Sequence, residues 1–237
     1  MKLTLIGTGA MYTAYNSACS LIDNKIIIDM PNGTVKQMLK LGIKLQDIDT
    51  ILVTHMHGDH TADIPFFIKY IFNYLKSTKE IKIIGPVGIK KKIIQLFNAY
   101  NFENEEEFNR EFNIEIIEVL KNKVSIDNYI IKSYEVVHGE EKPALGYVIN
   151  DKIGFTGDSG LCEGIEKIFK NSKLVVSDSS LINGDDCHLG FDNLQYLVRK
   201  YKNKIFCTHL RDKTREEIIN SNIENIEVNN DFFEIEV

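Results

Sequence analysis

Apolar residues recur along the chain in short β-branched runs that alternate with stretches of helical periodicity. Residues 50–54, Thr-Ile-Leu-Val-Thr, form an apolar run that is typical of a strand buried on both faces. Within residues 18–30, two apolar runs flank Asp23 and Asn24, which suit a tight turn, so this segment predicts a hairpin. Further strands are predicted at residues 2–7, 81–85, 113–119, 128–137, 144–150, 151–157, 173–178, 204–209 and 231–237.

Helical stretches lie between these strands. The helix predicted at 33–42 stops at Gly42, and the helix predicted at 62–76 tolerates Pro65 in its first turn. The acidic segment 101–112 predicts an exposed linker or helix. Further helices are predicted at residues 88–100, 164–170, 191–201 and 214–220. Many strands, several of them in hairpins, with helices between them favour a four-layer αββα sandwich, in which helices flank two mixed β-sheets.

The composition is that of an ordinary globular protein. The chain has 237 residues, of which 43% are hydrophobic, which is enough for a substantial core. No proline-rich, serine-rich or low-complexity linker marks a boundary, so we expect one domain over residues 1–237. The net charge of -6 argues against non-specific nucleic-acid binding, which requires a basic surface, although it leaves a local basic strip open.

The sequence predicts a cytoplasmic protein that does not enter a membrane. No apolar run approaches the roughly 18 residues that a membrane span requires, and the first ten residues lack the apolar centre of an export signal. The four cysteines are scattered without a CxxC spacing, and we interpret them as reduced thiols.

Half of the six histidines lie in one heptapeptide, Thr54-His55-Met56-His57-Gly58-Asp59-His60, directly after the apolar run 50–54. The polar residues are expected in a loop before a helix that begins near Thr61, with Gly58 permitting an unusual backbone angle. Imidazole and carboxylate groups are suitable ligands for divalent cations of the zinc type. Three histidines and an aspartate exceed what one cation needs if further ligands come from elsewhere, which suggests two adjacent cations.

The remaining histidines also follow predicted strands or precede a predicted helix. His138 and His209 stand at strand ends, Asp158 follows another strand, and His188 lies in a loop before a helix. No histidine is left over as an isolated surface residue. That economy is what a binuclear metal site would produce.

These residues resemble the metallo-β-lactamase superfamily, whose members have an αββα fold and two metal ions. The resemblance covers nearly the full length of the chain. It rests on the segments LIGTGA (5–10), IIIDMPNGT (26–34), THMHGDH (54–60), VVHGEEKPALGYVI (136–149), GFTGDSG (154–160), VVSDSS (175–180), CHLG (187–190) and CTHL (207–210). The HxHxDH motif with histidine, aspartate and histidine downstream in this order is highly specific.

The resemblance implies a ligand set for two divalent ions, with zinc favoured and manganese or iron as alternatives. It assigns His55, His57 and His138 to one ion and Asp59, His60 and His209 to the other. Asp158 would bridge both ions. Asp29, at the position of an early family aspartate, would orient a ligand histidine.

Within the superfamily, the chain is similar to the ribonuclease Z and phosphodiesterase branch. The segment IIGPVG (83–88) resembles that branch's GPxG turn, and His188 lies where it has an additional catalytic histidine. Two departures stand against transfer-RNA processing. Only 20 positions separate His138 from Asp158, where bacterial ribonuclease Z carries a long RNA-gripping arm, and Asp178 replaces the usual glutamate.

The resemblance therefore implies a hydrolase, with a phosphodiesterase as the first hypothesis. Asp59 would orient the nucleophile, and His188 would act as a general acid or stabilise the transition state. A lactonase or thioesterase on the same metals is the alternative, for which His188 would be dispensable. A metal-binding protein without turnover is a third. The expected partner is a phosphodiester or another small-molecule substrate. Nucleic acid is not favoured by the net charge, no membrane is expected, and a homodimer is left open.

Overall fold

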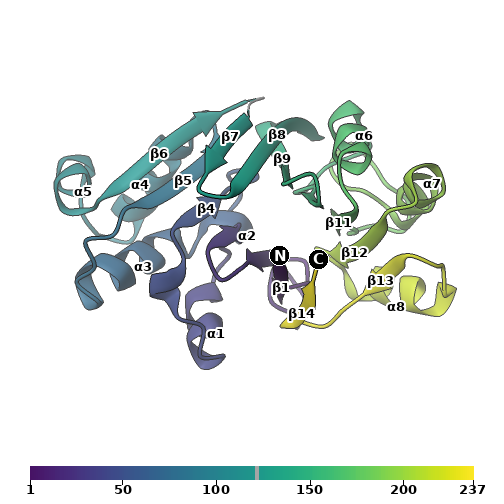
Figure 1. Ribbon diagram of the computed structural model, residues 1–237, viewed down its shortest axis with the longest axis horizontal. Coiled ribbons are helices and arrows are strands. Elements are labelled where there is room, and N and C mark those ends of the chain that lie inside the picture. Colours follow the sequence, from purple (N-terminus) through teal and green to yellow (C-terminus); the bar gives the residue numbers. More distant parts are fainter. Residues whose placement is uncertain (121–122) are drawn as a thin grey trace.

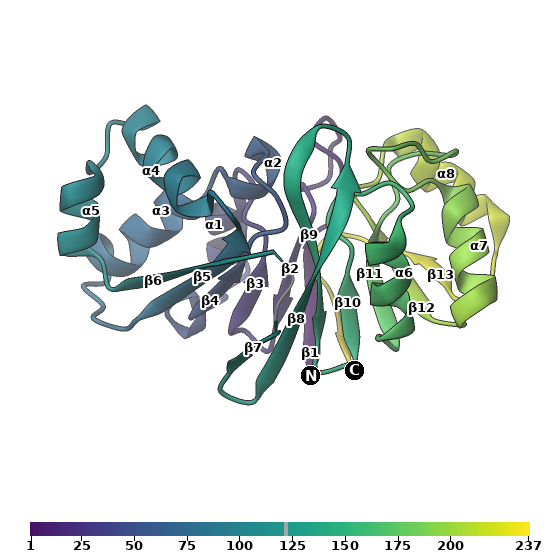
Figure 2. The same cartoon turned by 90° about the horizontal axis from the view of Figure 1, so that it is seen from above.

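Two β-sheets pack face to face, and helices cover the outer surface of each (Figures 1 and 2). The computed structural model describes residues 1–120 and 123–237. The first sheet is formed by β1 (Lys2–Gly7), β2 (Cys19–Ile22), β3 (Ile26–Ile28), β4 (Thr50–Leu52), β5 (Ile81–Pro86), β6 (Ile114–Val119) and β14 (Phe233–Glu236). The second is formed by β7 (Lys123–Ile126), β8 (Tyr129–His138), β9 (Glu141–Ile149), β10 (Ile153–Phe155), β11 (Leu174–Asp178), β12 (Lys204–Thr208) and β13 (Ile226–Val228).

Both sheets are mixed, as the hairpins in the sequence predict. The first has the order β14-β1-β2-β3-β4-β5-β6 and the second the order β13-β12-β11-β10-β9-β8-β7. Strands β3 to β6 run parallel, whereas β14, β1, β2 and β3 pair antiparallel. In the second sheet, β10 to β13 are parallel and β7 to β10 antiparallel. The four-layer αββα sandwich predicted from the sequence is therefore confirmed.

The helices divide into two groups along the chain (Figure 2). Those between strands of the first sheet are α1 (Thr34–Lys40), the short 3₁₀ segment η1 (Leu45–Asp47), α2 (Gly58–Thr61), α3 (Ile64–Lys69), the π-helical segment η2 (Tyr70–Tyr74), α4 (Ile89–Ala99) and α5 (Glu105–Glu111). Those between strands of the second sheet are α6 (Glu163–Lys170), α7 (Phe191–Tyr201) and α8 (Asp212–Ser221). Within the described ranges, no helix combines the length and the apolar character needed to cross a membrane.

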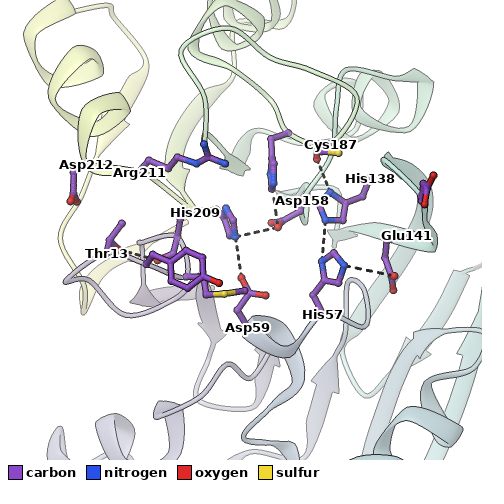
Figure 3. Close-up of a pocket in the computed structure, with 15 residues that line it drawn as sticks. Thr13, His57, Asp59, His138, Glu141, Asp158, Cys187, His209, Arg211 and Asp212 are labelled. Carbon is purple, nitrogen blue, oxygen red and sulfur yellow. Dashed lines mark hydrogen bonds and ion pairs between the residues drawn. The ribbon is translucent and has the colours of Figure 1, made fainter.

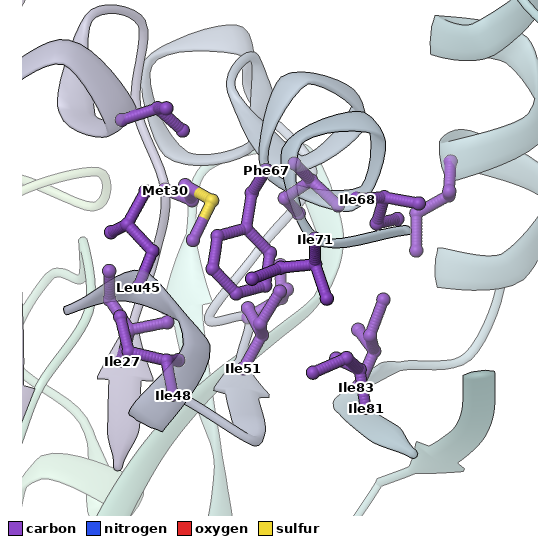
Figure 4. Packing of buried hydrophobic residues seen from close by; sticks show 14 of the residues in the cluster. Ile27, Met30, Leu45, Ile48, Ile51, Phe67, Ile68, Ile71, Ile81 and Ile83 are labelled. Atoms are coloured by element: carbon purple, nitrogen blue, oxygen red, sulfur yellow. The ribbon is translucent and has the colours of Figure 1, made fainter. Parts of the chain in front are cut away.

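Strand side chains alternate between two apolar layers, which explains why most positions of the central strands are apolar. In β3, β4 and β5, Ile27, Ile51 and Ile83 pack under the helices against Phe67 and Ile71 (Figure 4). Their neighbours along these strands, which are Ile28, Leu52 and Ile84, belong to the layer between the two sheets. Successive side chains on a strand point to opposite faces, so a strand covered on both faces needs two apolar sets.

The same alternation builds the outer layer of the second sheet. Val175 and Ile205 pack with Ile165 and Leu194 from the covering helices. Because the strands are held from both sides, the loops at their carboxyl ends start from fixed positions.

Some elements differ from the sequence prediction. The short strands β7 and β13 were not predicted, because three or four residues with polar neighbours give little periodic signal. The segment 101–112 contains α5, which Asn104 and Glu107 begin with a reciprocal capping box. Its Phe108 and Phe112 are buried, so only the polar face of this segment is exposed. The helix predicted at 62–76 is divided into α3 and the π-helical η2.

Candidate metal centre

The loops after β4, β8, β10 and β12 meet in one pocket of about 1060 Å³ (Figure 3). Parallel and hairpin strands bring these loops together from positions far apart in the sequence. The pocket is lined by Ala10, Met11, Tyr12, Thr13, His57, Asp59, His138, Glu140, Glu141, Asp158, Cys187, His188, His209, Arg211 and Asp212. His55 and His60 lie behind this lining and are fully buried. All six histidines of the chain are thus in or beside the pocket.

The polar residues of the heptapeptide 54–60 were predicted to lie in a loop, but the structure places part of the heptapeptide in a helical turn. His57 precedes the single helical turn α2, which carries Asp59 and His60. The Thr61 hydroxyl donates to the His57 carbonyl at 2.8 Å, which stabilises this turn. Gly58 has no positive φ, and a Cβ there would meet no atom within 4 Å. The expectation of an unusual backbone angle at Gly58 is therefore wrong.

Three imidazoles converge at the first candidate ligand set. His57 Nδ1 lies 3.1 Å from His55 Nε2 and 3.2 Å from His138 Nε2. The His138 Nδ1–H donates to the Cys187 carbonyl at 2.7 Å, which leaves its Nε2 as the atom with the lone pair. The His55 Nδ1 lies 3.1 Å from the Thr54 hydroxyl. Three ring nitrogens that face one another at these distances could all coordinate one cation through their lone pairs.

The second candidate set contains Asp59, His60 and His209. The His209 Nε2 lies 3.4 Å from Asp59 Oδ2, and His60 Nε2 lies 3.8 Å from the same oxygen. The Ser180 hydroxyl donates to the His209 carbonyl and accepts from His209 Nδ1 at 2.6 Å, so the His209 Nε2 faces the set. The His60 Nε2 is buried and has no hydrogen-bond partner among the described residues. A buried nitrogen without a partner is unfavourable unless it binds a ligand.

Asp158 lies between the two sets. Its Oδ2 is 3.9 Å from His55 Nε2, 3.4 Å from His60 Nε2 and 3.2 Å from His209 Nε2. The preceding Gly157 has a φ of 60°, and a Cβ there would lie 2.8 Å from the Leu145 carbonyl oxygen and from the Thr54 side chain. The sharp turn that directs Asp158 inward therefore requires glycine.

The pKa shifts follow from burial and from these contacts. Burial, followed by the charge of His60, holds the pKa of His55 well below its usual range, which keeps this imidazole neutral. Burial opposes ionisation of Asp158, but His209 and His60 hold its pKa well below the usual value. In His60, Asp158 and Asp29 outweigh burial and raise the pKa well above the usual value. Carboxylates and imidazoles that are this close stabilise one another's charged forms.

The donor set fits divalent cations of the zinc, manganese or iron type. Nitrogen and carboxylate oxygen donors are the ligands that these cations take in proteins. Each of the two predicted ligand sets forms a group in which one donor atom per residue lies within 4.8 Å of the others. The orphaned His60 Nε2 gives a second, independent reason for the fit.

His188 and Asp178 form a pair beside the ligand sets. The His188 Nδ1 lies 2.9 Å from Asp178 Oδ2 and 4.0 Å from Asp158 Oδ2. Although burial opposes it, the hydrogen bond and charge of Asp178 raise the pKa of His188. Asp178 is a site residue that was not predicted, since its sequence position stood out only as a departure from a family pattern. Asp178 stands at the end of a predicted strand, as several candidate ligands do, and this position could have identified it as a site residue.

Other pocket residues were also missed, notably Glu141, Arg211 and Tyr12. The Glu141 Oε2 lies 3.8 Å from His57 Nε2, and Tyr12 is 92% exposed. None of them directly follows a predicted strand, so no pattern distinguishes them from ordinary surface residues.

Asp29 lies behind the pocket and connects two parts of it. It accepts hydrogen bonds from the Thr54 backbone N–H at 2.8 Å, from the Thr54 hydroxyl at 2.7 Å and from His60 Nδ1 at 2.8 Å. This places it where the sequence predicted a residue that orients a ligand histidine. The bond leaves the His60 Nε2 facing the ligand set.

Asp29→Asn is expected to weaken metal affinity about 10- to 100-fold, the usual effect of losing an outer partner of a ligand histidine. Equilibrium titration of metal-free protein with Zn²⁺ measures this change. Asp63→Asn is the matched control, because Asp63 is also buried but accepts from the Val35 backbone N–H at 2.9 Å and forms no hydrogen bond or ion pair with a histidine in the described part of the chain. Equal affinities in the two variants would contradict the role of Asp29.

The arrangement of the two sheets and their covering helices is the metallo-β-lactamase fold, which solved structures of similar shape share. Residues 1–229 match the family model described as anti-Pycsar protein Apyc1, and the chain belongs to that family. Similar solved structures include a diphosphatase from the PhnP family, with a TM-score of 0.81 and 18% identity over 100% of this chain and 97% of that one. Human tRNase Z, short form (ELAC1), has a TM-score of 0.77 and 20% identity over 100% and 99%.

The similarity to curated relatives covers only part of their length. Ribonuclease Z of Nanoarchaeum equitans is 29% identical over 185 residues, which are 76% of this chain and 56% of that protein. The chain spans 56%, 64% and 48% of the first three curated relatives that it matches.

Proposed function

We propose that this protein is a hydrolase that uses two divalent cations to cleave small phosphodiesters. The observation that carries the proposal is the convergence of two His/Asp ligand sets and the His188–Asp178 pair on one pocket. The similarity to ribonuclease Z and to a PhnP-family diphosphatase supports the same class of reaction.

His55, His57 and His138 would hold one cation, Asp59, His60 and His209 the other, and Asp158 both. Zinc is favoured, with manganese and iron as alternatives. Bound there, a pair of cations lowers the pKa of a water and neutralises charge on phosphoryl oxygens. The Asp158 carboxylate, between two imidazole-rich sets, would serve as a ligand of both cations.

The protein groups would control the nucleophile and the leaving group. Asp59 lies in the pocket wall and would orient the attacking water and accept its proton. Asp178 accepts from His188 Nδ1, which leaves the His188 Nε2 to donate a proton to the departing oxygen. A carbonyl substrate polarised by the same cations would not require His188, so a requirement for His188 would distinguish phosphodiester from acyl chemistry.

The pocket rim favours a small substrate with one negative charge. Glu140, Glu141 and Asp212 are negatively charged and line the pocket, where they would repel a polyanion. Most residues between His138 and Asp158 belong to strands β9 and β10. No arm is formed there that could grip an RNA, in agreement with the departure noted in the sequence.

The test is a side-by-side assay of metal-loaded protein on a chromogenic phosphodiester, a lactone and a thioester. A series of a cyclic mononucleotide, a dinucleotide and a transfer-RNA precursor adds increasing charge. We expect hydrolysis of the small diesters, decreasing along the series, and loss of activity with a chelator that returns when metal is added. Hydrolysis of the lactone or thioester alone would replace this proposal with the acyl hydrolase.

A further inference from the structure

Charge is distributed unevenly around the pocket. Apart from the candidate ligands Asp59 and Asp158, the acidic side chains that line the pocket are Glu140, Glu141 and Asp212. Among the lining residues, Arg211 is the one lysine or arginine. A pocket that binds an anion next to so many carboxylates needs a fixed positive charge in addition to its metals.

The backbone at Arg211 is held firmly. His209 has a φ of 53°, and the next residue, Leu210, is anchored on both sides. The Leu210 N–H donates to the Thr8 carbonyl at 3.1 Å, and its carbonyl accepts from the Ala10 N–H at 3.0 Å. The Arg211 carbonyl then accepts from the Arg215 N–H at 2.9 Å as α8 begins. The position of Arg211 is therefore tied to that of the ligand His209.

The Arg211 side chain is directed into the pocket (Figure 3). No hydrogen bond or ion pair joins its guanidinium to another described residue, and the side chain is exposed. Its charge nevertheless reaches the loop that carries His188. The pKa of Asp185 is lowered although burial opposes this shift. The lowering comes from hydrogen bonds donated by the backbone N–H groups of Cys187 and His188, and then from the charges of His188 and Arg211.

We propose that Arg211 is a substrate-binding residue that contacts the phosphoryl group from the α8 side of the pocket. A guanidinium presents planar N–H donors that match two phosphoryl oxygens at once. This inference rests on the proposed function and extends it, because it assigns the selection of an anionic substrate over a neutral ester to one residue. Tyr12 and Met11 on the neighbouring loop are uncharged and add no second cation to this wall.

The test compares Arg211→Ala and Arg211→Lys with Lys213→Ala in metal-loaded protein. Lys213 is the matched control, since it is an exposed cation two positions along the chain that does not line the pocket. The first readout is binding of inorganic phosphate by calorimetry. The second is the division between KM and kcat for a chromogenic phosphodiester, and thermal denaturation confirms folding.

Arg211→Ala is expected to weaken phosphate binding about 10- to 100-fold, the usual range for a hydrogen bond to a charged group. Its KM should rise more than its kcat falls, because the contact exists before reaction. Arg211→Lys should be intermediate, since lysine keeps the charge without the planar donors. Lys213→Ala should match the wild type.

Equal phosphate affinities in Arg211→Ala and Lys213→Ala would overturn the inference, as would a wild type that binds no phosphate. A wild type that binds phosphate through Arg211 but hydrolyses no diester would support the inference and refute the proposed function. The two failures are therefore distinguishable.

Discussion

Asp158→Asn is expected to remove most of the bound metal and, with it, measurable hydrolysis. The side chain keeps its shape in this variant but loses the charge that lies 3.2 Å from His209 Nε2 and 3.4 Å from His60 Nε2. Because Asp158 would serve both cations, the loss of affinity should exceed the roughly 10- to 100-fold that an outer partner such as Asp29 costs. Metal content by elemental analysis and turnover of a chromogenic diester measure both effects.

The control for Asp158→Asn is Asp47→Asn, because Asp47 is an exposed aspartate outside the pocket lining. It should retain the metal content and the turnover of the wild type. Retention of two equivalents of metal by Asp158→Asn would show that the carboxylate is not a common ligand.

His188→Ala is expected to lower kcat about 10²- to 10⁴-fold for a phosphodiester, the range for loss of a general acid, while metal content stays full. Its Nδ1 is bonded to Asp178 rather than to a member of the ligand sets, so the imidazole can be removed without removing a donor. Unchanged turnover would exclude His188 from the mechanism.

Asp178→Asn provides a second variant of the same pair. Asp178 raises the pKa of His188, so its neutralisation lowers that pKa relative to the wild type. A general acid must be protonated, and the alkaline limb of the kcat profile should therefore move to lower pH. The kcat of the double variant, Asp178→Asn with His188→Ala, should be only slightly lower than that of His188→Ala, because both changes affect the same hydrogen-bonded pair.

The sequence was sufficient to predict the fold class and to identify the candidate ligands. Apolar runs located the central strands, and residues such as His138 and His209 were identifiable because they follow such runs directly. It was insufficient where the local backbone depends on tertiary contacts. The helical turn under Asp59 and His60 and the ordinary angles at Gly58 depend on neighbours that no periodicity reveals.

The pocket rim was less predictable than the ligand sets. Arg211 and Glu141 are single charged residues in a chain with many, and only the folded chain distinguishes them. The expectations of a single domain, a cytoplasmic location and a homodimer stay predictions.

The edge of β1 is covered by β14, a strand from the opposite end of the described chain. Strand β14 pairs with β1 from Lys2↔Glu236 to Leu5↔Phe233, and Asp231 accepts from the Thr8 and Asn16 backbone N–H groups. A ribosome must therefore release the last of these residues before the edge of β1 is covered. Until then the nascent polypeptide exposes the unpaired edge of β1, which is prone to pair with other chains.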